Sequence, residues 1–310
     1  MFGKILFATT ASPGSNNAAK SAFDLAERNE ARLYLFHVFG APTRGFGHLV
    51  RDLKSGEEDL VDTDYREWVQ EELHTIYADQ IKGLSKGTLA TQLAVGVPHT
   101  EILRFARQED VDIIVMGAHN SEEDNTSSRS RAVIGNTMRK VARAAKCPVL
   151  IVNRPCTTCW RMFSNIIFCT DFSKAADAAF QFAYKTAKEV GAKLYLFHAC
   201  DISNALLGVY AGQVEIERKL AKAREMMQER YISRMEGFDN YQVEIWEGTP
   251  YVEILKFARD KKADLIVMAH HTHDVHEDEA EIGSTVEQVV LRSACPVASV
   301  NRMDKVSELA

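Results

Sequence analysis

The sequence predicts an α/β protein with two doubly wound domains, each a parallel sheet with helices on both faces. Two observations support this fold class. The sequence contains an internal duplication, and each half alternates short, continuously apolar runs with segments of helical periodicity. Continuously apolar strands between helices are typical of a parallel sheet covered on both sides. Right-handed crossovers then give a doubly wound, Rossmann-like fold.

The duplication rests on three matched blocks in the same order. LYLFH occurs at 33–37 and again at 194–198, EILRFAR at 101–107 is answered by EILKFAR at 253–259, and CPV followed by VNR occurs at 147–154 and at 295–302. The offset shrinks from 161 to 152 to 148 residues, which indicates longer loops in the first half. We therefore expect a first domain at 1–153, a linker at 154–163, a second domain at 164–303 and a C-terminal tail at 304–310.

The elements of the first half follow from apolar spacing and from end signals. Ser15 or Asn16 suits the N-cap of the first helix, and Pro98 suits the first position of a later one. We expect strands at 4–9, 32–38, 88–96, 112–118 and 148–153, and helices at 15–29, 57–83, 98–109 and 136–145. In the long helix, the residues expected to face the core are Leu60, Val61, Trp68, Leu73, Ile76 and Ile81. The second half repeats this order.

Composition narrows the function classes. The chain has 310 residues, of which 46% are hydrophobic and 26% charged, as in soluble globular proteins. A net charge of −6 argues against a general nucleic-acid partner. No apolar run approaches the ~18 residues of a membrane span, and the start MFGKILFATT reads as a first strand, so we expect a cytoplasmic protein without membrane contact. Six cysteines are too sparse for a disulfide scaffold.

Several motifs together carry a family resemblance. They are TDFS at 170–173, G-x-P-x-x-E-I at 96–102 and 248–254, a strand ending in Met116-Gly117, CPV before each last strand, and Gly283-Ser284-Thr285 opening a helix. With these motifs the whole chain resembles a tandem universal stress protein. The resemblance implies a five-stranded sheet of order 3-2-1-4-5 in each domain, pairing of the two domains within the chain, and a role in the stress response. A homodimer and an unidentified protein partner are further expectations.

The same resemblance implies where a nucleotide would bind. In open α/β sheets, ligands bind beyond the carboxyl ends of the strands at the switch point, here between strands one and four. Many family members bind ATP there through G-x-x-G, nine residues, then G-[S/T]. Glycines let the backbone approach the phosphates, and the following helix start offers N–H groups to an anion. An acid after strand one contacts the ribose region, and a residue after strand two meets the base.

Carried over by position, this pattern selects candidate cofactor-binding residues in both halves. The second half offers Asp171, Ala199, Met268, Gly283, Ser284 and Thr285, and the first offers Val38, Met116, Gly117, Gly135, Asn136 and Thr137. Neither half keeps the full pattern: Ala269 and Thr272 replace the first two glycines of the second half, whereas the first half has Thr10 for the acid and Asn120 for a glycine. We interpret this as a degenerate ATP site, better kept in the second domain. The alternative is that Gly135 and Gly283 are ordinary helix-start residues in a fold that has lost its nucleotide.

Histidines and cysteines offer other chemistry. His270, His271, His273 and His276 lie among acids, and imidazoles with carboxylates can bind zinc, but their spacing fits no named structural site. We favour a solvated loop over a metal site. A third interpretation is that these histidines become protonated below about pH 6.5 and add positive charge beside a bound phosphate.

The C-x-x-C of Cys156 and Cys159 falls in the linker and is interpreted as incidental, with half of a zinc site or a redox switch as alternatives. Cys147 and Cys295 are expected to be buried thiols, and the duplicated His37 and His198 to share a packing or hydrogen-bonding role.

The functional hypothesis follows from what is present and what is missing. The sequence contains no nucleophile elbow, P-loop lysine or paired acid motif, so no catalytic residue is assigned and enzyme activity is not the leading expectation. The leading hypothesis is a nucleotide-responsive stress sensor or regulatory interaction module, with ATP as its expected ligand. The alternatives are a slow ATP hydrolase and a ligand-free scaffold with a metal site on the histidine loop.

Overall fold

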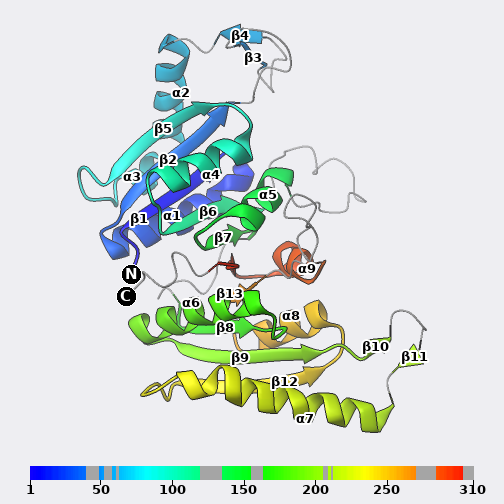
Figure 1. Ribbon diagram of the computed structural model, residues 1–310. Helices are drawn as coiled ribbons and strands as arrows, with labels where there is room; N and C mark the ends of the chain where they lie inside the picture. The colour runs from blue at the N-terminus through cyan, green and yellow to red at the C-terminus, as the bar shows by residue number, and fades with distance from the viewer. Residues whose placement is uncertain are drawn as a thin grey trace. The chain divides into compact units, whose positions relative to one another are not determined.

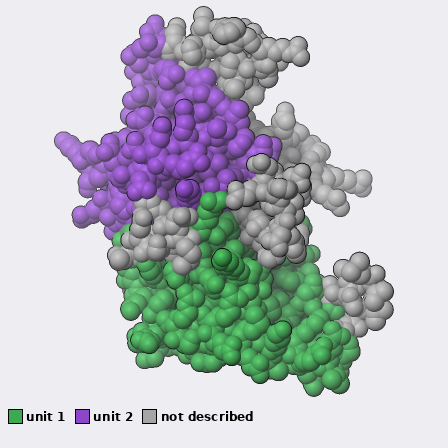
Figure 2. All heavy atoms as spheres, viewed as in Figure 1, with its two compact units in different colours: residues 1, 153–310 green, residues 2–152 purple. Residues whose placement is uncertain are grey.

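A computed structural model describes most of the chain: residues 1–39, 49–51, 58–60, 63–118, 135–154, 163–204, 209–210, 212–269 and 284–302 (Figure 1). The chain divides into two compact units, residues 2–152 and residues 153–310 with Met1, which Figure 2 colours separately. We call them the N-terminal unit and the C-terminal unit. Most of the expected linker, and the expected tail, lie outside the described residues.

In the described part of the N-terminal unit, five parallel strands form the sheet. Strand β1 pairs with β2 and β6, β2 also pairs with β5, and β6 also pairs with β7, which gives the order 3-2-1-4-5. The elements are β1 (Lys4–Thr9), a 3-10 turn η1 (Pro13–Ser15), α1 (Asn16–Asn29), β2 (Arg32–Phe39), β3 (Leu49–Arg51), β4 (Glu58–Leu60), α2 (Thr63–Ile76), α3 (Ala78–Ile81), β5 (Leu89–Val95), α4 (Pro98–Gln108), β6 (Ile113–Gly117), α5 (Asn136–Ala144) and β7 (Val149–Val152).

The C-terminal unit has the same topology over its described residues. Strand β8 pairs in parallel with β9 and β13, β9 also with β12, and β13 also with β14. Its elements are β8 (Asn165–Cys169), α6 (Lys174–Val190), β9 (Lys193–Cys200), β10 (Ser203–Asn204), β11 (Val209–Tyr210), α7 (Gln213–Arg230), η4 (Ile232–Arg234), β12 (Tyr241–Glu247), α8 (Pro250–Asp260), β13 (Leu265–Met268), α9 (Ser284–Arg292) and β14 (Val297–Ser299). The predicted fold class is therefore confirmed.

Helices cover both faces of each sheet, and the strand register shows how. In the C-terminal unit, Cys169 of β8 is level with Phe197 of β9, so Phe168 and Phe197 project from opposite faces because side chains alternate along a strand. Phe168 contacts Phe180 of α6, whereas Phe197 stacks on Phe257 of α8 at 4.5 Å. The N-terminal unit repeats this arrangement with α1 on one face and α4 on the other. Both sheets are therefore buried between helical layers, which explains why the middle residues of their central strands are apolar.

The predicted helix at 57–83 is wrong in its extent and in its buried face. Residues 58–60 form β4, which pairs antiparallel with β3, and the helical part is divided into α2 and α3 at Tyr77. Trp68 is 53% exposed and Ile76 is 38% exposed, so neither faces the core. The buried residues are Val69, Leu73 and Tyr77, which recur at the four-residue spacing of one helix face. Leu73 is the one fully buried member of the predicted core set whose burial is described; Ile81 is half-buried, and Trp68 and Ile76 point away from the core.

The repeated G-x-P-x-x-E motif has a steric explanation. Gly96 and Gly248 adopt φ of 152° and 140°, in the region that favours glycine. A Cβ on Gly248 would come within 2.9 Å of the Glu253 Cγ atom, and one on Gly96 within 2.8 Å of the Glu101 Cγ atom. The motif therefore lets a glutamate in the first turn of the following helix pack against the strand end.

Candidate functional site

The turns that follow the first strand of each unit lie at the switch point. We call residues 9–12 the post-β1 turn and residues 170–173 the post-β8 turn. Ala8 of β1 is level with Met116 of β6, and Cys169 of β8 is level with Met268 of β13, so the carboxyl ends of strands one and four meet at each turn. In this topology a ligand would bind just beyond these ends.

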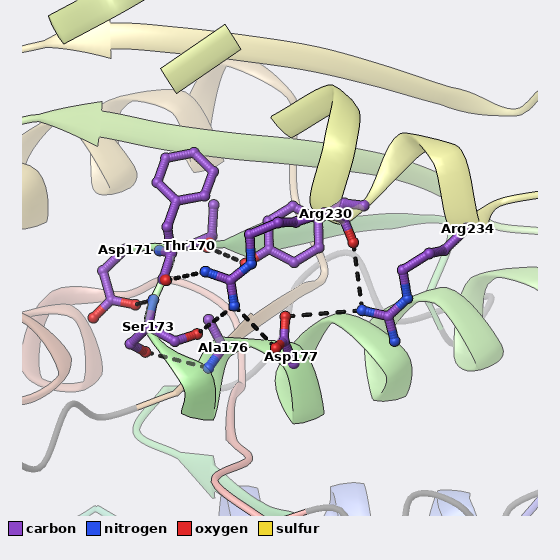
Figure 3. Close-up of polar contacts among 9 residues, drawn as sticks. Thr170, Asp171, Ser173, Ala176, Asp177, Arg230 and Arg234 are labelled. Atoms are coloured by element: carbon purple, nitrogen blue, oxygen red, sulfur yellow. Dashed lines mark hydrogen bonds and ion pairs between the residues drawn. The ribbon is translucent and has the colours of Figure 1, made fainter. Parts of the chain in front are cut away.

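A buried threonine anchors each turn to a buried tyrosine. In the C-terminal unit, the Thr170 hydroxyl lies 2.7 Å from the Tyr231 hydroxyl and accepts the N–H of Phe172 at 2.9 Å (Figure 3). The N-terminal unit makes the same bonds: Thr9 to Tyr77 at 2.7 Å, and the Ala11 N–H to Thr9 at 2.9 Å. The two turns are thus held by the same device despite different flanking residues.

The third residue of each turn is in the left-handed region, although neither is a glycine. Ala11 has φ of 57° and Phe172 has φ of 61°. This conformation costs a residue with a Cβ about 1 kcal/mol, so it persists only where other contacts enforce it. The hydroxyl of the turn's first residue, Thr9 or Thr170, supplies that contact by accepting the N–H of Ala11 or Phe172.

A histidine from the second strand completes each anchor. The His198 Nδ1 atom lies 2.7 Å from the Thr170 carbonyl, and the His37 Nδ1 atom lies 3.0 Å from the Thr9 carbonyl. A carbonyl can only accept, so Nδ1 carries the hydrogen in both rings. Burial lowers the pKa of both histidines, although these hydrogen bonds act in the opposite direction, and the neutral form is favoured. The hydrogen-bonding role expected from the duplication is confirmed.

The candidate residues of the C-terminal unit lie along this edge as far as they are described. Asp171 is exposed, and its Oδ1 atom accepts the Ser173 N–H at 2.9 Å. Ala199 is buried near the end of β9, and Met268 is buried at the end of β13. Helix α9 begins at Ser284 and precedes the parallel strand β14, so its N-terminus and Thr285 belong to the same edge. Gly283 lies outside the described residues.

The N-terminal unit places its candidates at the equivalent edge. Met116 and Gly117 end β6, and the Gly135 N–H donates to the Ala118 carbonyl at 3.1 Å, which brings the start of α5 to the end of that strand. Gly135 has φ of −60°, a value open to any residue, so backbone conformation does not require a glycine there. Asn136 is exposed and Thr137 half-buried in the first turn of α5, and Val38 is half-buried near the end of β2.

The two post-strand turns differ in the group they present. The N-terminal unit has Thr10 where the C-terminal unit has Asp171. The Thr10 hydroxyl lies 2.9 Å from that of Ser12 and 3.3 Å from that of Ser15, so it belongs to a cluster of hydroxyls. Only the C-terminal turn therefore offers a carboxylate to a ligand.

The predictions about histidines and cysteines can be compared with the structure only in part. His270, His271, His273 and His276, together with Cys156 and Cys159, lie outside the described residues. Within the described part of the chain, no three histidine, cysteine or acidic side chains are grouped closely enough to hold a metal ion. Cys147 and Cys295 are buried free thiols, as expected.

The threonine–tyrosine anchors were not among the predicted features, although the sequence carries a signal for them. Thr9 and Thr170 are separated by 161 residues, the same offset as the LYLFH block. Tyr77 and Tyr231 are separated by 154 residues, between that offset and the 152 of the later block. A residue-by-residue comparison of the two halves would have found both pairs. The arginine that joins the C-terminal turn, Arg230, has no counterpart in such a comparison, because Ile76 precedes Tyr77.

Both halves of the chain are similar to known proteins. Residues 1–153 and 162–301 both match the model of the Universal stress protein family. A universal stress protein of Methanocaldococcus jannaschii is 29% identical over 165 residues, covering 50% of this chain and 84% of that protein. The universal stress protein YxiE of Bacillus subtilis is 31% identical over 153 residues, covering 49% of this chain and 99% of that protein. The solved structure of a universal stress protein from Archaeoglobus fulgidus covers 96% of this chain and 98% of its own, with a TM-score of 0.67 at 22% identity, and so shares the fold.

Proposed function

Because the chain belongs to the universal stress protein family over both of its halves, we propose that it is a nucleotide-responsive stress protein whose C-terminal unit binds an adenine nucleotide. The observation that carries this proposal is the exposed carboxylate of Asp171 at the carboxyl edge of the sheet, directly after β8. A carboxylate there can accept hydrogen bonds from the hydroxyls of a ribose.

The surroundings of Asp171 suit the rest of a nucleotide. Helix α9 begins at the same edge, and the N–H groups of a helix's first turn are unpaired within the helix and attract an anion such as phosphate. Ala199 contributes a small side chain near the end of β9, where a larger one would occupy space needed by a base. These features support a single ligand that spans the switch point from β9 to α9.

We further propose that the N-terminal unit is the weaker binder. Its turn offers the Thr10 hydroxyl, which is already bonded to neighbouring serines, in place of a carboxylate. A ligand at this unit would have to exchange those hydrogen bonds for its own. The asymmetry favours one nucleotide per chain, with the N-terminal unit serving mainly as a structural or partner-binding half.

Regulation through a protein partner is the proposed output, with nucleotide as the signal. Mass spectrometry of small molecules released from the purified protein tests the ligand directly, and an adenine nucleotide near one equivalent per chain is expected. Release of no nucleotide, with no ATP binding on titration, would contradict the proposal and favour a ligand-free scaffold. ATP turnover that disappears in Asp171→Ala would favour the slow hydrolase instead.

In the part of the chain that the structure describes, no helix combines the length and the apolar character needed to cross a membrane. A cytoplasmic location stays a proposal. So do homodimer formation and pairing of the two units within the chain.

A further inference from the structure

The post-β8 turn is held by an arginine as well as by the threonine anchor. Arg230, the last residue of α7, donates from Nη1 to the Phe172 carbonyl and from Nη2 to the Ser173 carbonyl at 3.1 Å (Figure 3). Its Nη2 atom also lies 2.9 Å from the Asp177 Oδ2 atom in the first turn of α6. One guanidinium thus joins the end of α7, the turn and the start of α6.

These contacts fix the backbone on both sides of Asp171. The Thr170 carbonyl is bonded to His198, and the Phe172 and Ser173 carbonyls are bonded to Arg230. A planar guanidinium has several donors in a rigid arrangement, so it can hold two carbonyls and a carboxylate at once in a way that a lysine cannot. The backbone around Asp171 is therefore set by residues far away in the sequence, while the Asp171 side chain itself stays exposed.

Contacts beyond the turn support the same arrangement. The Ser173 hydroxyl accepts the Ala176 N–H at 3.3 Å and so caps α6. This bond fixes the last residue of the turn at the start of the helix. Asp177 is also approached by Arg234, whose Nη1 atom lies 3.8 Å from its Oδ1 atom. Arg234 also donates from Nη1 to the Arg230 carbonyl at 3.4 Å. It therefore lies on the same carboxylate and at the same helix end as Arg230, and it serves as the matched arginine.

The N-terminal unit has the tyrosine of this device without the arginine. Ile76 precedes Tyr77 where Arg230 precedes Tyr231, and Ile76 is 38% exposed. The chain after the post-β1 turn forms the 3-10 turn η1 before α1, whereas α6 starts directly after the post-β8 turn. The arginine thus occurs in the unit that carries the carboxylate and is replaced in the unit that lacks it.

We propose that Arg230 is a positioning residue that orients Asp171 toward a nucleoside, so that the end of α7 sets how tightly the C-terminal unit binds nucleotide. This inference rests on the proposed nucleotide site. A shift of α7 relative to the turn would release two carbonyls and with them the direction of the Asp171 carboxylate.

The test is a double-mutant cycle on affinity for ATP, measured by calorimetry. Arg230→Gln should weaken binding roughly tenfold, within the range of coupling between contacting residues. Asp171→Ala should weaken binding at least as much, and adding Arg230→Gln to Asp171→Ala should then change affinity no further. The control Arg234→Ala removes a cation from the same Asp177 and should leave affinity within about twofold.

Hydrogen exchange without ligand gives a second readout. The amides of Ser173 and Ala176 bond within the turn and its cap, so their exchange should accelerate in Arg230→Gln and stay unchanged in Arg234→Ala. Additive losses of affinity in the cycle, or unchanged exchange in Arg230→Gln, would overturn the positioning role while the nucleotide site stands. Absence of ATP binding by the wild-type protein would overturn the proposed function, and this inference with it.

Discussion

Replacing Tyr231 with phenylalanine removes one hydroxyl from the interior of the C-terminal unit and tests the anchor of the post-β8 turn. The Tyr231 ring is fully buried and packs against Phe168 and Phe180 at 5.1 and 4.8 Å, so the ring contacts survive the change. What is lost is the 2.7 Å hydrogen bond to Thr170. A buried neutral hydrogen bond of this kind contributes about 1 to 1.5 kcal/mol to the free energy of unfolding.

The magnitude is isolated by a cycle with Thr170→Val. That change alone should destabilise more than Tyr231→Phe, because it also releases the Phe172 N–H in its left-handed conformation. In the double variant the two losses should overlap by about 1 kcal/mol. Urea denaturation followed by circular dichroism, with Tyr77→Phe as the matched change in the other unit, measures these differences. Strictly additive effects, or a Tyr231→Phe variant as stable as the wild type, would refute the anchor.

Alkaline pH tests the same residue with a defined sign. Burial raises the pKa of Tyr231 to about 12, whereas an unfolded tyrosine titrates near pH 10. The folded state thus keeps its proton over a range in which the unfolded state loses it. The stability contributed is fully present below about pH 10 and declines by roughly 2 to 3 kcal/mol as the pH rises toward 12. The Tyr231→Phe variant should lack this part of the stability loss at alkaline pH. An equal loss of stability in the wild type and the variant would contradict the prediction.

Three further changes test other parts of the fold. Glu30 ends α1 with φ of 50° where Gly191 ends α6 with φ of 71°, so Glu30→Gly should raise the unfolding free energy by about 0.5 to 1 kcal/mol; a decrease in thermal stability would contradict this. Asp264 is buried and accepts the N–H groups of Ser164 and Asn165, and burial raises its pKa to about 6. The stability difference between wild type and Asp264→Asn should therefore shift against the wild type by about 2 kcal/mol from pH 4 to pH 7, and a difference independent of pH would exclude the raised pKa. Gly248→Ala should destabilise by about 1 to 3 kcal/mol because its Cβ meets Glu253, and a variant with unchanged urea midpoint would show that the glutamate moves freely.

The central strands could be predicted from sequence because burial on both faces makes their middle residues continuously apolar. The run KILFAT coincides with β1, and the run at 32–38 differs from β2 by one residue. The region after β2 was predicted poorly because its apolar residues serve several purposes. Leu60 belongs to a short strand and Trp68 is exposed, while Tyr77 is buried against strand one.

The position of the candidate site could be predicted from the sequence, but the residues that hold its backbone in place could not. Asp171 follows strand one in the sequence, so its place at the sheet edge comes directly from the topology. Its supports do not, because Tyr231 and Arg230 lie 61 and 58 residues from the groups they bond. Contacts over such distances depend on how α7 packs on the sheet, which periodicity alone does not specify. The duplication was the one available signal, and it reveals the tyrosine but not the arginine.

The most direct test of the central claim is a calorimetric titration of ATP into the wild-type protein, Asp171→Ala and Thr10→Ala. These two substitutions remove equivalent side chains from the two post-strand turns, so they distinguish the units under identical conditions. We expect saturable binding near one ATP per chain. Asp171→Ala should weaken this binding at least tenfold, and Thr10→Ala should bind within about twofold of the wild type. No binding by the wild-type protein, or equal binding by the wild type and Asp171→Ala, would contradict it.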